Sequence, residues 1–332
     1  MQVPFTSTTH DLKKNNIVRI IETLTLLGMA TKAQLASRTG LSVATCGTVL
    51  NTLCERNQVA VHQIEASSGG RPAQCYAINP DYYKHLGLYV EGSDDAARIV
   101  WSVNSATGVR LAQGEYDFLP LTLDNFERQI SLLLAEHPGI KAAGIGLPGV
   151  VAQGKVITCD ISLFENIDII DFLRKKYGLY IHADNDMNYT AWGFYRNSGS
   201  KTGAPVAYIY LPGVACAGCG IVVNDEILRG ASNFAGEVAY LSDYPKQTLP
   251  PEEELALILT SIIAIINPAR VAVSGLALNE NLLSEAIAIC TRRIPQRNMP
   301  DTVYRHSRRE DYLLGITEQV TQAYLRHEIF NG

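Results

Sequence analysis

Two acids and two amides stand together in the stretch ADNDMN, residues 183–188. The segment before it, GLYIHA, has the apolar character of a strand, and the residues after it begin a helix. A carboxylate at such a turn, Asp186, could act as the base that takes a proton from a substrate hydroxyl. Because Asn and Asp are also favoured helix caps, the same residues remain open to a purely structural interpretation.

The chain that must position these residues is 332 residues long, which is enough for two or three structural units. Residues 1–80 contain seven Lys/Arg and four Asp/Glu, a net of +3, so the whole chain's −5 leaves −8 for the remainder. We therefore predict a basic head, residues 1–80, that binds a polyanion, and an acidic body, residues 81–332, that does not.

Nothing in the sequence indicates a membrane protein. The first residues, MQVPFTSTTHDLKK, lack the apolar core of a signal peptide, and the most apolar run, 255–266, is too short to span a bilayer. That run is interpreted as a buried helix. The seven cysteines are scattered and odd in number, which favours reduced thiols over a disulfide framework. The expected localisation is cytoplasmic.

The head has the helix pattern of a DNA-binding motif. Apolar residues recur at helical spacing from Asn16 to Leu27, which predicts a first helix. Thr31 suits the cap of a second helix, Gly40 its left-handed end, and Ser42 the cap of a third. Two helices joined by so short a turn form a helix-turn-helix. Its predicted inward-facing residues are Leu35, Leu41, Cys46, Val49 and Leu53.

Short polar side chains lie on the outward face of the third helix, where they can reach bases and phosphates in a major groove. Two strand-like runs follow around a Gly-rich tip, SSGGRPAQ, and predict a β-wing. The predicted DNA-binding residues are Lys32, Ser42, Thr45, Thr48, Asn51 and Arg71. The alternative is a three-helix interaction module that never contacts DNA. The agreement of helix-turn-helix, wing and positive charge favours DNA binding.

Strand-like runs and helices alternate along the body. Three consecutive strand-like runs, HLGLYVEG, AARIVWSVN and VRLAQGEYDF, precede a helix and the segment KAAGIGLPG. From Ala204 the plan repeats with APVAYIYLPG, GCGIVVNDEILRG, long helices and ARVAVSG. This order predicts two α/β lobes with mixed sheets and a cleft between them. Lobe 1 should comprise about 83–196 with a final helix from the segment 309–332 packed back on it, and lobe 2 about 197–308.

Six motifs in order resemble those of the ROK family of repressors and sugar kinases, in particular its transcriptional-regulator branch. They are the wing GGRP, GLPG at 146–149, ADNDMN at 183–188, VVNDEILRGA at 222–231, AGE at 235–237 and INPARVAVSG at 266–275. The resemblance covers nearly the whole chain. It implies an N-terminal winged helix-turn-helix (α+β) followed by a two-lobe α/β body of the actin/hexokinase-like, ribonuclease H-like fold.

The resemblance also implies a sugar site. Asp186 falls on the family's catalytic acid, and Glu237 falls on its sugar-binding glutamate. The implied ligand-binding residues are Gly149, Asn185, Asp186 and Glu237. Adjacent hydroxyls suit such groups because each hydroxyl both donates and accepts a hydrogen bond, and two carboxylates disfavour a phosphate placed against them. A free sugar is therefore expected rather than a phosphorylated one.

The ATP motifs of the family are degenerate in this sequence. Family kinases begin lobe 1 with Asp-x-Gly-Gly-Thr, whereas this chain has YVEGS, with Tyr89 for the Asp and Glu91 for a Gly. The second phosphate loop, VACAGCG, keeps only Gly218 and Gly220, and a later Gly-Gly has become SGL at 274–276. Since bare backbone amides cradle phosphates in such loops, these losses predict no ATP cofactor and make Asp186 a relic base.

The zinc site of the family is also missing. Tyr240 stands where the family has a His after AGE, and no downstream cysteine cluster follows. Cys216 and Cys219 form a CxxC pair, but a tetrahedral zinc needs four ligands. We therefore predict no metal and no cofactor, and interpret these cysteines as small residues in the former phosphate turn.

The sequence thus favours a DNA-binding transcriptional regulator, most simply a repressor of carbohydrate-related genes, with a catalytically inactive body. A single winged helix covers few base pairs, so the chain should bind a double-stranded operator as a dimer or a dimer of dimers. The body is expected to serve dimerisation and could sense a free sugar. The alternatives are a ROK-type sugar kinase with an added DNA-binding head, and a DNA-binding or partner-binding protein that senses nothing.

Overall fold

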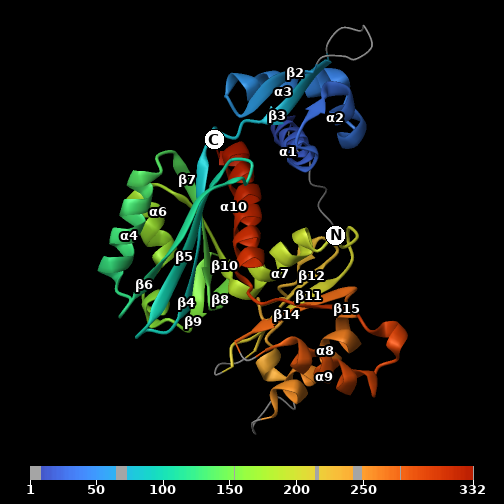
Figure 1. Ribbon diagram of the computed structural model, residues 1–332. Coiled ribbons are helices and arrows are strands. Elements are labelled where there is room, and N and C mark those ends of the chain that lie inside the picture. The colour runs from blue at the N-terminus through green and yellow to red at the C-terminus, as the bar shows by residue number, and fades with distance from the viewer. Residues whose placement is uncertain are drawn as a thin grey trace, which may run out of the picture.

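The computed structural model describes residues 9–64, 73–152, 154–213, 217–241, 249–276 and 278–331. Figure 1 shows a small head, two larger lobes with a sheet each, and a long C-terminal helix that runs from the junction of the lobes to the head. This architecture confirms the predicted fold class, a winged helix-turn-helix followed by a two-lobe α/β body.

Three helices form most of the head: α1 (Thr9–Leu27), α2 (Lys32–Thr39) and α3 (Val43–Glu55). The predicted caps are confirmed. Thr31 forms a reciprocal capping box with Gln34, Gly40 ends α2 at φ 73°, and Ser42 accepts a hydrogen bond from the backbone N of Thr45. The predicted start of α1 at Asn16 is wrong, because its first turns are polar and show no apolar spacing.

A three-stranded sheet completes the head, with strands β1 (Ala30–Thr31), β2 (Val59–Ile64) and β3 (Ala73–Ile78) in the order β1-β3-β2. All pairings are antiparallel, and β2 and β3 form the hairpin that the sequence predicts as a wing. The predicted tip of the wing, which carries Arg71, lies outside the described residues.

Lobe 1 contains a mixed five-stranded sheet in the order β10-β7-β4-β5-β6, as predicted for a body of this class. Its strands are β4 (Lys84–Gly92), β5 (Ala97–Ser105), β6 (Arg110–Phe118), β7 (Ile140–Leu147) and β10 (Tyr180–Asn185). The first three are antiparallel, and β7 and β10 run parallel to β4.

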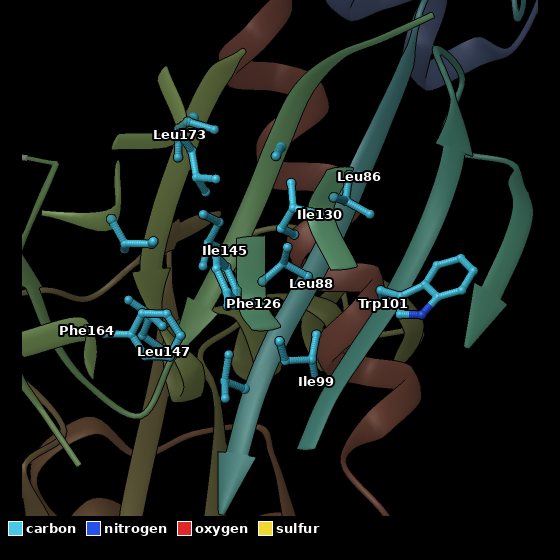
Figure 2. Close-up of a cluster of buried hydrophobic side chains, with 14 of the residues drawn as sticks. Leu86, Leu88, Ile99, Trp101, Phe126, Ile130, Ile145, Leu147, Phe164 and Leu173 are labelled. Carbon is cyan, nitrogen blue, oxygen red and sulfur yellow. The ribbon is translucent and has the colours of Figure 1, made fainter. Parts of the chain in front are cut away.

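Helices cover one face of this sheet, and Figure 2 shows the apolar side chains buried between them, among them Phe126, Ile145 and Phe164. The helices are α4 (Leu123–Glu136), α5 (Ser162–Asn166) and α6 (Ile169–Tyr177), and the hairpin β8 (Gly149–Ala152) and β9 (Lys155–Cys159) adjoins them. The sequence analysis identified α4 but not α5, α6 or this hairpin.

Lobe 2 has a second mixed five-stranded sheet, in the order β13-β12-β11-β14-β15. Its elements are β11 (Val206–Leu211), β12 (Gly218–Val223), β13 (Glu226–Ile227), β14 (Arg270–Gly275), β15 (Asp301–Tyr304), α8 (Pro251–Ile266), α9 (Glu280–Thr291) and the 3-10 turns Val238–Tyr240 and Gln296–Asn298. The apolar run 255–266 forms most of α8, and its inner face is buried against α9 and the sheet, as expected. Within the described ranges, no helix has the length and apolar character needed to cross a bilayer.

Two helices cross at the junction of the lobes: α7 (Asp186–Asn197) and α10 (Arg309–Asn331). Besides contacting each other, helix α7 packs on β11 and β12 of lobe 2 and α10 packs on β4 and β7 of lobe 1. Their backbones approach so closely that a Cβ at Gly193 would overlap the carbonyl oxygen of Asp311, and one at Gly315 would overlap that of Tyr189. The lobe boundary at residue 196 stays a prediction.

The far end of α10 joins the core of the head. Val320, Tyr324, Leu325 and Ile329 are buried in one cluster with apolar residues of α1. Arg326 forms an ion pair with Glu22 of α1, with 2.6 Å between its Nη2 and the carboxylate. Helix α10 therefore contacts the junction of the lobes at one end and the head at the other (Figure 1).

The crossing of α7 and α10 predicts that Gly193→Ala is destabilising. The added methyl must separate the two backbones, at a cost of about 2 kcal/mol or more in the free energy of unfolding. The matched control is Gly47→Ala in α3, where an added Cβ meets only the Lys32 side chain at 3.6 Å and helix propensity alone should stabilise by about 0.5–1 kcal/mol. Urea denaturation measures both variants, and equal effects would show that the crossing is not the constraint.

Candidate functional site

Asn185 caps helix α7 and ties it to the hairpin of lobe 1. Its side-chain oxygen accepts hydrogen bonds from the backbone N of Met187 (2.7 Å) and Asn188 (3.2 Å). Its amide nitrogen donates to the carbonyl oxygen of Gly149 (2.7 Å). The structure thus brings together two of the predicted ligand residues, but it does so by bonding them to each other.

Asp186 is held by an arginine that the sequence analysis did not identify. Arg308 Nη1 donates to Asp186 Oδ2 at 2.6 Å, and the two side chains are only 9% and 13% exposed. The other carboxylate oxygen accepts from the backbone N of Met187 at 2.9 Å. Although burial alone would lower the pKa of Arg308, the adjacent Asp186 carboxylate raises it well above its usual value. Asp186 therefore has a permanent counter-ion.

Arg308 also belongs to a column of aromatic rings that crosses from lobe 1 to lobe 2. The rings of Tyr89 in β4 and Tyr312 in α10 stack at 4.1 Å. The Arg308 guanidinium lies 5.3 Å from the Tyr312 ring and 4.0 Å from that of Tyr210 in β11. By the family resemblance, Tyr89 marks the first phosphate loop. Bulky side chains therefore pack where a kinase presents bare backbone to a nucleotide.

Two glycines that survive from the second phosphate loop have a packing role. A Cβ at Gly220 would overlap the carbonyl oxygen of Met187, and one at Gly218 would lie 2.8 Å from the Met187 side chain. Strand β12 can therefore lie directly against the start of α7 only because these residues lack side chains. Residues 214–216 of the same loop lie outside the described residues.

Glu237 is close enough to Asp186 for the charges of the two carboxylates to interact, and a third carboxylate, Asp160, joins them. The pKa of Glu237 is raised by burial and further by the charges of Asp186 and Asp160. The pKa of Asp160 is raised in the same way, by burial and by Asp186. Asp160 follows directly on β9, and an acid after the strand-like run KVITC is the signal that could have identified it.

Asp184 forms a second link between the lobes. Its carboxylate is buried at the end of β10, where it accepts a hydrogen bond from the Asn188 side chain (2.8 Å) and pairs with Arg229 of lobe 2. Burying a charge requires such partners, so the acids of ADNDMN are both paired with arginines far away in the sequence.

The cysteines have no ligand set around them in the described part of the chain, where no group of three His, Cys, Asp or Glu side chains is arranged to hold a metal. Burial, with the nearby Glu237, raises the pKa of Cys219 to about 12, so its thiol is protonated at neutral pH. Cys216 lies outside the described residues. Tyr240, at the position of the family's histidine, is exposed and its ring packs 5.0 Å from that of Phe234.

The predicted base-reading residues at the start of α3 and along it differ in exposure and in hydrogen bonding. Ser42, Thr48 and Asn51 are exposed, and Thr45 is partly buried. The hydroxyls of Ser42 and Thr45 bond each other at 2.8 Å, and that of Thr48 donates to the Ala44 carbonyl at 3.2 Å. The amide of Asn51 has no hydrogen-bond partner within the described residues. Asn51 is therefore the predicted residue best able to read a base edge.

Two other residues of the motif complete this surface. Lys32 lies with its ammonium 5.5 Å from the Tyr76 ring centroid, so its stem packs on the sheet. Val43 begins α3 and is 53% exposed, although sequence reasoning missed it. An exposed apolar residue in the first turn of a recognition helix can contact a thymine methyl group.

A winged helix-turn-helix joined through one helix to a two-lobed, sugar-kinase-like body defines the class of this protein. The model of the ROK family matches residues 122–242. The six motifs, the two-lobe fold and the N-terminal domain agree with this match.

Curated relatives include two xylose repressors. That of Caldicellulosiruptor bescii is 22% identical over 238 residues, which cover 69% of this chain and 59% of the relative. That of Bacillus subtilis strain 168 is 23% identical over 237 residues, covering 70% and 61%. The matched region thus spans about three fifths of the curated relatives' length.

Solved structures share the fold. A ROK family transcriptional regulator, a homolog of the E. coli MLC protein, aligns with a TM-score of 0.70 at 16% identity over 97% of this chain and 100% of its own. A ROK glucokinase from Streptomyces griseus aligns with a TM-score of 0.57 at 18% identity over 72% and 99%. The regulator alignment extends over nearly all of this chain, whereas the kinase alignment covers less than three quarters of it.

The buried ion pair predicts that Arg308→Met is strongly destabilising, by about 3–5 kcal/mol, because it leaves Asp186 charged and unpaired. The double variant with Asp186→Asn should recover most of the loss, since neither charge then remains. Urea denaturation of both single variants and the double variant gives the coupling energy.

The neighbouring Arg309 is the matched control. It pairs with Glu115 at 2.6 Å, but both side chains are exposed by a third or more, so Arg309→Met should cost less than about 1 kcal/mol. Similar losses for Arg308→Met and Arg309→Met would contradict the role of the buried pair.

Proposed function

We propose that the protein is a DNA-binding transcriptional repressor of carbohydrate-related genes whose body has lost phosphotransferase chemistry. The observation that carries this proposal is Arg308, which pairs with the predicted relic base Asp186 and packs against the rings of Tyr312 and Tyr210. The relatives named xylose repressors, and the N-terminal domain shared with a ROK regulator, support the regulatory part.

The inactive body follows from the chemistry of Asp186. A general base must be free to bond the substrate hydroxyl, and here the Asp186 carboxylate is bonded to the Arg308 guanidinium at 2.6 Å and to the backbone N of Met187. The column of Tyr89, Tyr312 and Tyr210 adds a second obstacle, because it offers rings rather than amides to a phosphate. The alternative, a sugar kinase with an added head, would be favoured by ATP-dependent sugar phosphorylation that Asp186→Asn abolishes.

The DNA-binding mode rests on the exposed face of α3. One winged helix supplies few base contacts, so we propose that two copies bind a near-palindromic operator, in the cytoplasm, with half-sites spaced by turns of the duplex. Helix α3 would lie in the major groove with Val43, Thr48 and Asn51 at the bases. The body would hold the two heads at that spacing.

The sensing role rests on Glu237, whose carboxylate has no hydrogen-bond partner among the described residues. We propose a neutral sugar bound near Gly149, Asn185, Asp186 and Glu237. Because Asn185 and Asp186 already make bonds within the protein, Glu237 would supply the main new contact. A sugar here would lie where both lobes meet the start of α7, and α10 connects this junction to the head. Ligand binding can change DNA affinity only if the sugar prefers one arrangement of these parts.

Asn51→Ala should reduce discrimination between operator and random DNA by about 1–3 kcal/mol, or roughly five-fold to a hundred-fold, with Thr48→Ala having a smaller effect in the same direction. Arg71→Ala should instead weaken binding to all sequences alike. It should also lower the slope of log affinity against log salt concentration by about 1. Fluorescence anisotropy with operator and scrambled duplexes separates the two effects. Equal losses on both duplexes for Asn51→Ala would argue against base reading by α3.

For the sugar, calorimetry with a panel of free pentoses and hexoses should detect binding in the high micromolar to millimolar range, because few hydrogen bonds of roughly 1 kcal/mol each are available. Glu237→Ala should lower the affinity about ten-fold or more. Tyr240→Ala, an exposed residue of the same segment, is the control. If no sugar binds, or if Glu237→Ala binds as well as wild type, the cleft does not sense sugars and only the DNA-binding part of the proposal stands.

A further inference from the structure

An open groove lies away from Asp186 and Glu237. It has a volume of about 400 Å³ and lies between α7, the β12–β13 hairpin and the C-terminal half of α10; Figure 1 labels α7, β12 and α10. Its walls include Trp192 of α7, Asp225, Glu226 and Arg229 of the hairpin, and Gln319, Gln322 and Arg326 of α10. Pockets for small molecules commonly have volumes of roughly 300–1,000 Å³, so the groove has room for a hexose-sized compound.

The groove is separate from the cleft of Asp186 and Glu237. None of the residues that line it belongs to the predicted sugar site. Trp192 lies six positions beyond Asp186, or about 9 Å along α7 at the usual helical rise. The groove is therefore not a part of the family's ligand site as this chain presents it.

The walls of the groove are held in place by bonds to the rest of the protein. Asp225 accepts hydrogen bonds from the Tyr195 hydroxyl and from the backbone N of Gly203 (2.8 Å), which fixes the tip of the hairpin. Arg229 pairs with the buried Asp184, and Arg326 pairs with Glu22. A preformed site costs little ordering entropy when a ligand binds.

Several polar side chains in the groove have no hydrogen-bond partner in the described part of the chain: those of Gln319, Gln322 and Glu226. Trp192 is only 6% exposed, and its indole nitrogen is fully buried, so the residue contributes ring atoms to the wall. The groove thus presents two amides and a carboxylate with spare hydrogen-bonding capacity.

The charges of the groove decide which ligands suit it. Arg229 and Arg326 already have carboxylate partners, whereas Glu226 is unpaired within the described residues and the charge of Asp225 is met only by neutral donors. The local surplus is therefore negative, which disfavours a phosphate or carboxylate ligand. Amide groups and carboxylates together match hydroxyl groups, because each hydroxyl both donates and accepts.

We propose that this groove is a second binding site, which takes a small neutral polyhydroxy compound. Its occupant contacts lobe 2 through the hairpin and α10 through Gln319 and Gln322, next to the Arg326–Glu22 pair that holds the head. The site stands on its own geometry and does not require that the cleft binds a sugar or that the head binds DNA.

Intrinsic fluorescence provides a direct test, because the chain has two tryptophans and one of them lines the groove. Trp101→Phe, in the core of lobe 1, leaves Trp192 as the only tryptophan, which is excited selectively at the red edge of the absorption band, where tyrosine does not absorb. In this background D-xylose, D-glucose and xylitol are titrated to high millimolar concentration, and the expected result is a saturable change in Trp192 emission with at least one of them.

Three variants in the same background show which site produces the change in Trp192 emission. Gln319→Ala combined with Gln322→Ala should weaken the titration ten-fold or more, whereas Glu237→Ala in the cleft should leave it unchanged. Asn281→Ala, an exposed helical amide of α9 far from the groove in sequence, is the control and should have no effect. Circular dichroism confirms that each variant is folded.

Two results would overturn the proposal. The first is the absence of any saturable change with all three compounds. The second is a change that Glu237→Ala abolishes and the double glutamine variant leaves intact, which would place the ligand in the cleft alone. Operator binding, measured separately, tells the failure of the groove from a failure of the proposed repressor function.

Discussion

The contact between the backbones of α7 and α10 is the constraint on which the rest of the body depends. Helix α7 packs on the sheet of lobe 2 and α10 on the sheet of lobe 1, so their crossing at Gly193 and Gly315 fixes how the lobes meet. Helices this close can shift only together, because protein interiors are packed at the density of organic crystals. The far end of α10 lies in the core of the head, so the position of the head depends on the same crossing.

The buried ion pair is a consequence of that crossing. Asp186 begins α7 and Arg308 immediately precedes α10, so the close approach of the helices brings a carboxylate and a guanidinium together out of water. Such a pair adds little net stability over apolar residues, but breaking it is costly, and it thus specifies one arrangement of the elements that contribute to it. Tyr89, Tyr312 and Tyr210 surround the guanidinium and extend this arrangement across both lobes. The inactive body that we propose is consistent with this arrangement, because a kinase must open to exchange nucleotides.

Local features of the fold could be predicted from the sequence, and long-range features could not. The caps Thr31 and Ser42 and the left-handed Gly40 act through neighbours within three or four residues, so their residue types were sufficient. Asp186 and Arg308 are 122 positions apart, and no spacing rule relates them. Helix α6 could have been predicted, because Asp168 caps it, Ile169, Ile170 and Leu173 recur at helical spacing, and Gly178 ends it. The family motifs located Glu237 near Asp186, but they did not reveal Asp160, because its role depends on where the hairpin β8–β9 folds.

The structure also changes what the surviving motif residues imply. Asn185 has a complete set of bonds as a helix cap, and Asp186 is needed as the counter-ion of a buried arginine. Gly218 and Gly220 are needed because β12 lies against Met187. Each of these residues would therefore be retained in a protein that binds no ligand at all. Glu237 differs, since burial and two like charges raise its pKa and no partner among the described residues compensates it. A carboxylate held at such a cost to stability is typical of a functional site, so the case for a ligand in the cleft rests on Glu237 rather than on the motif that contains the relic base.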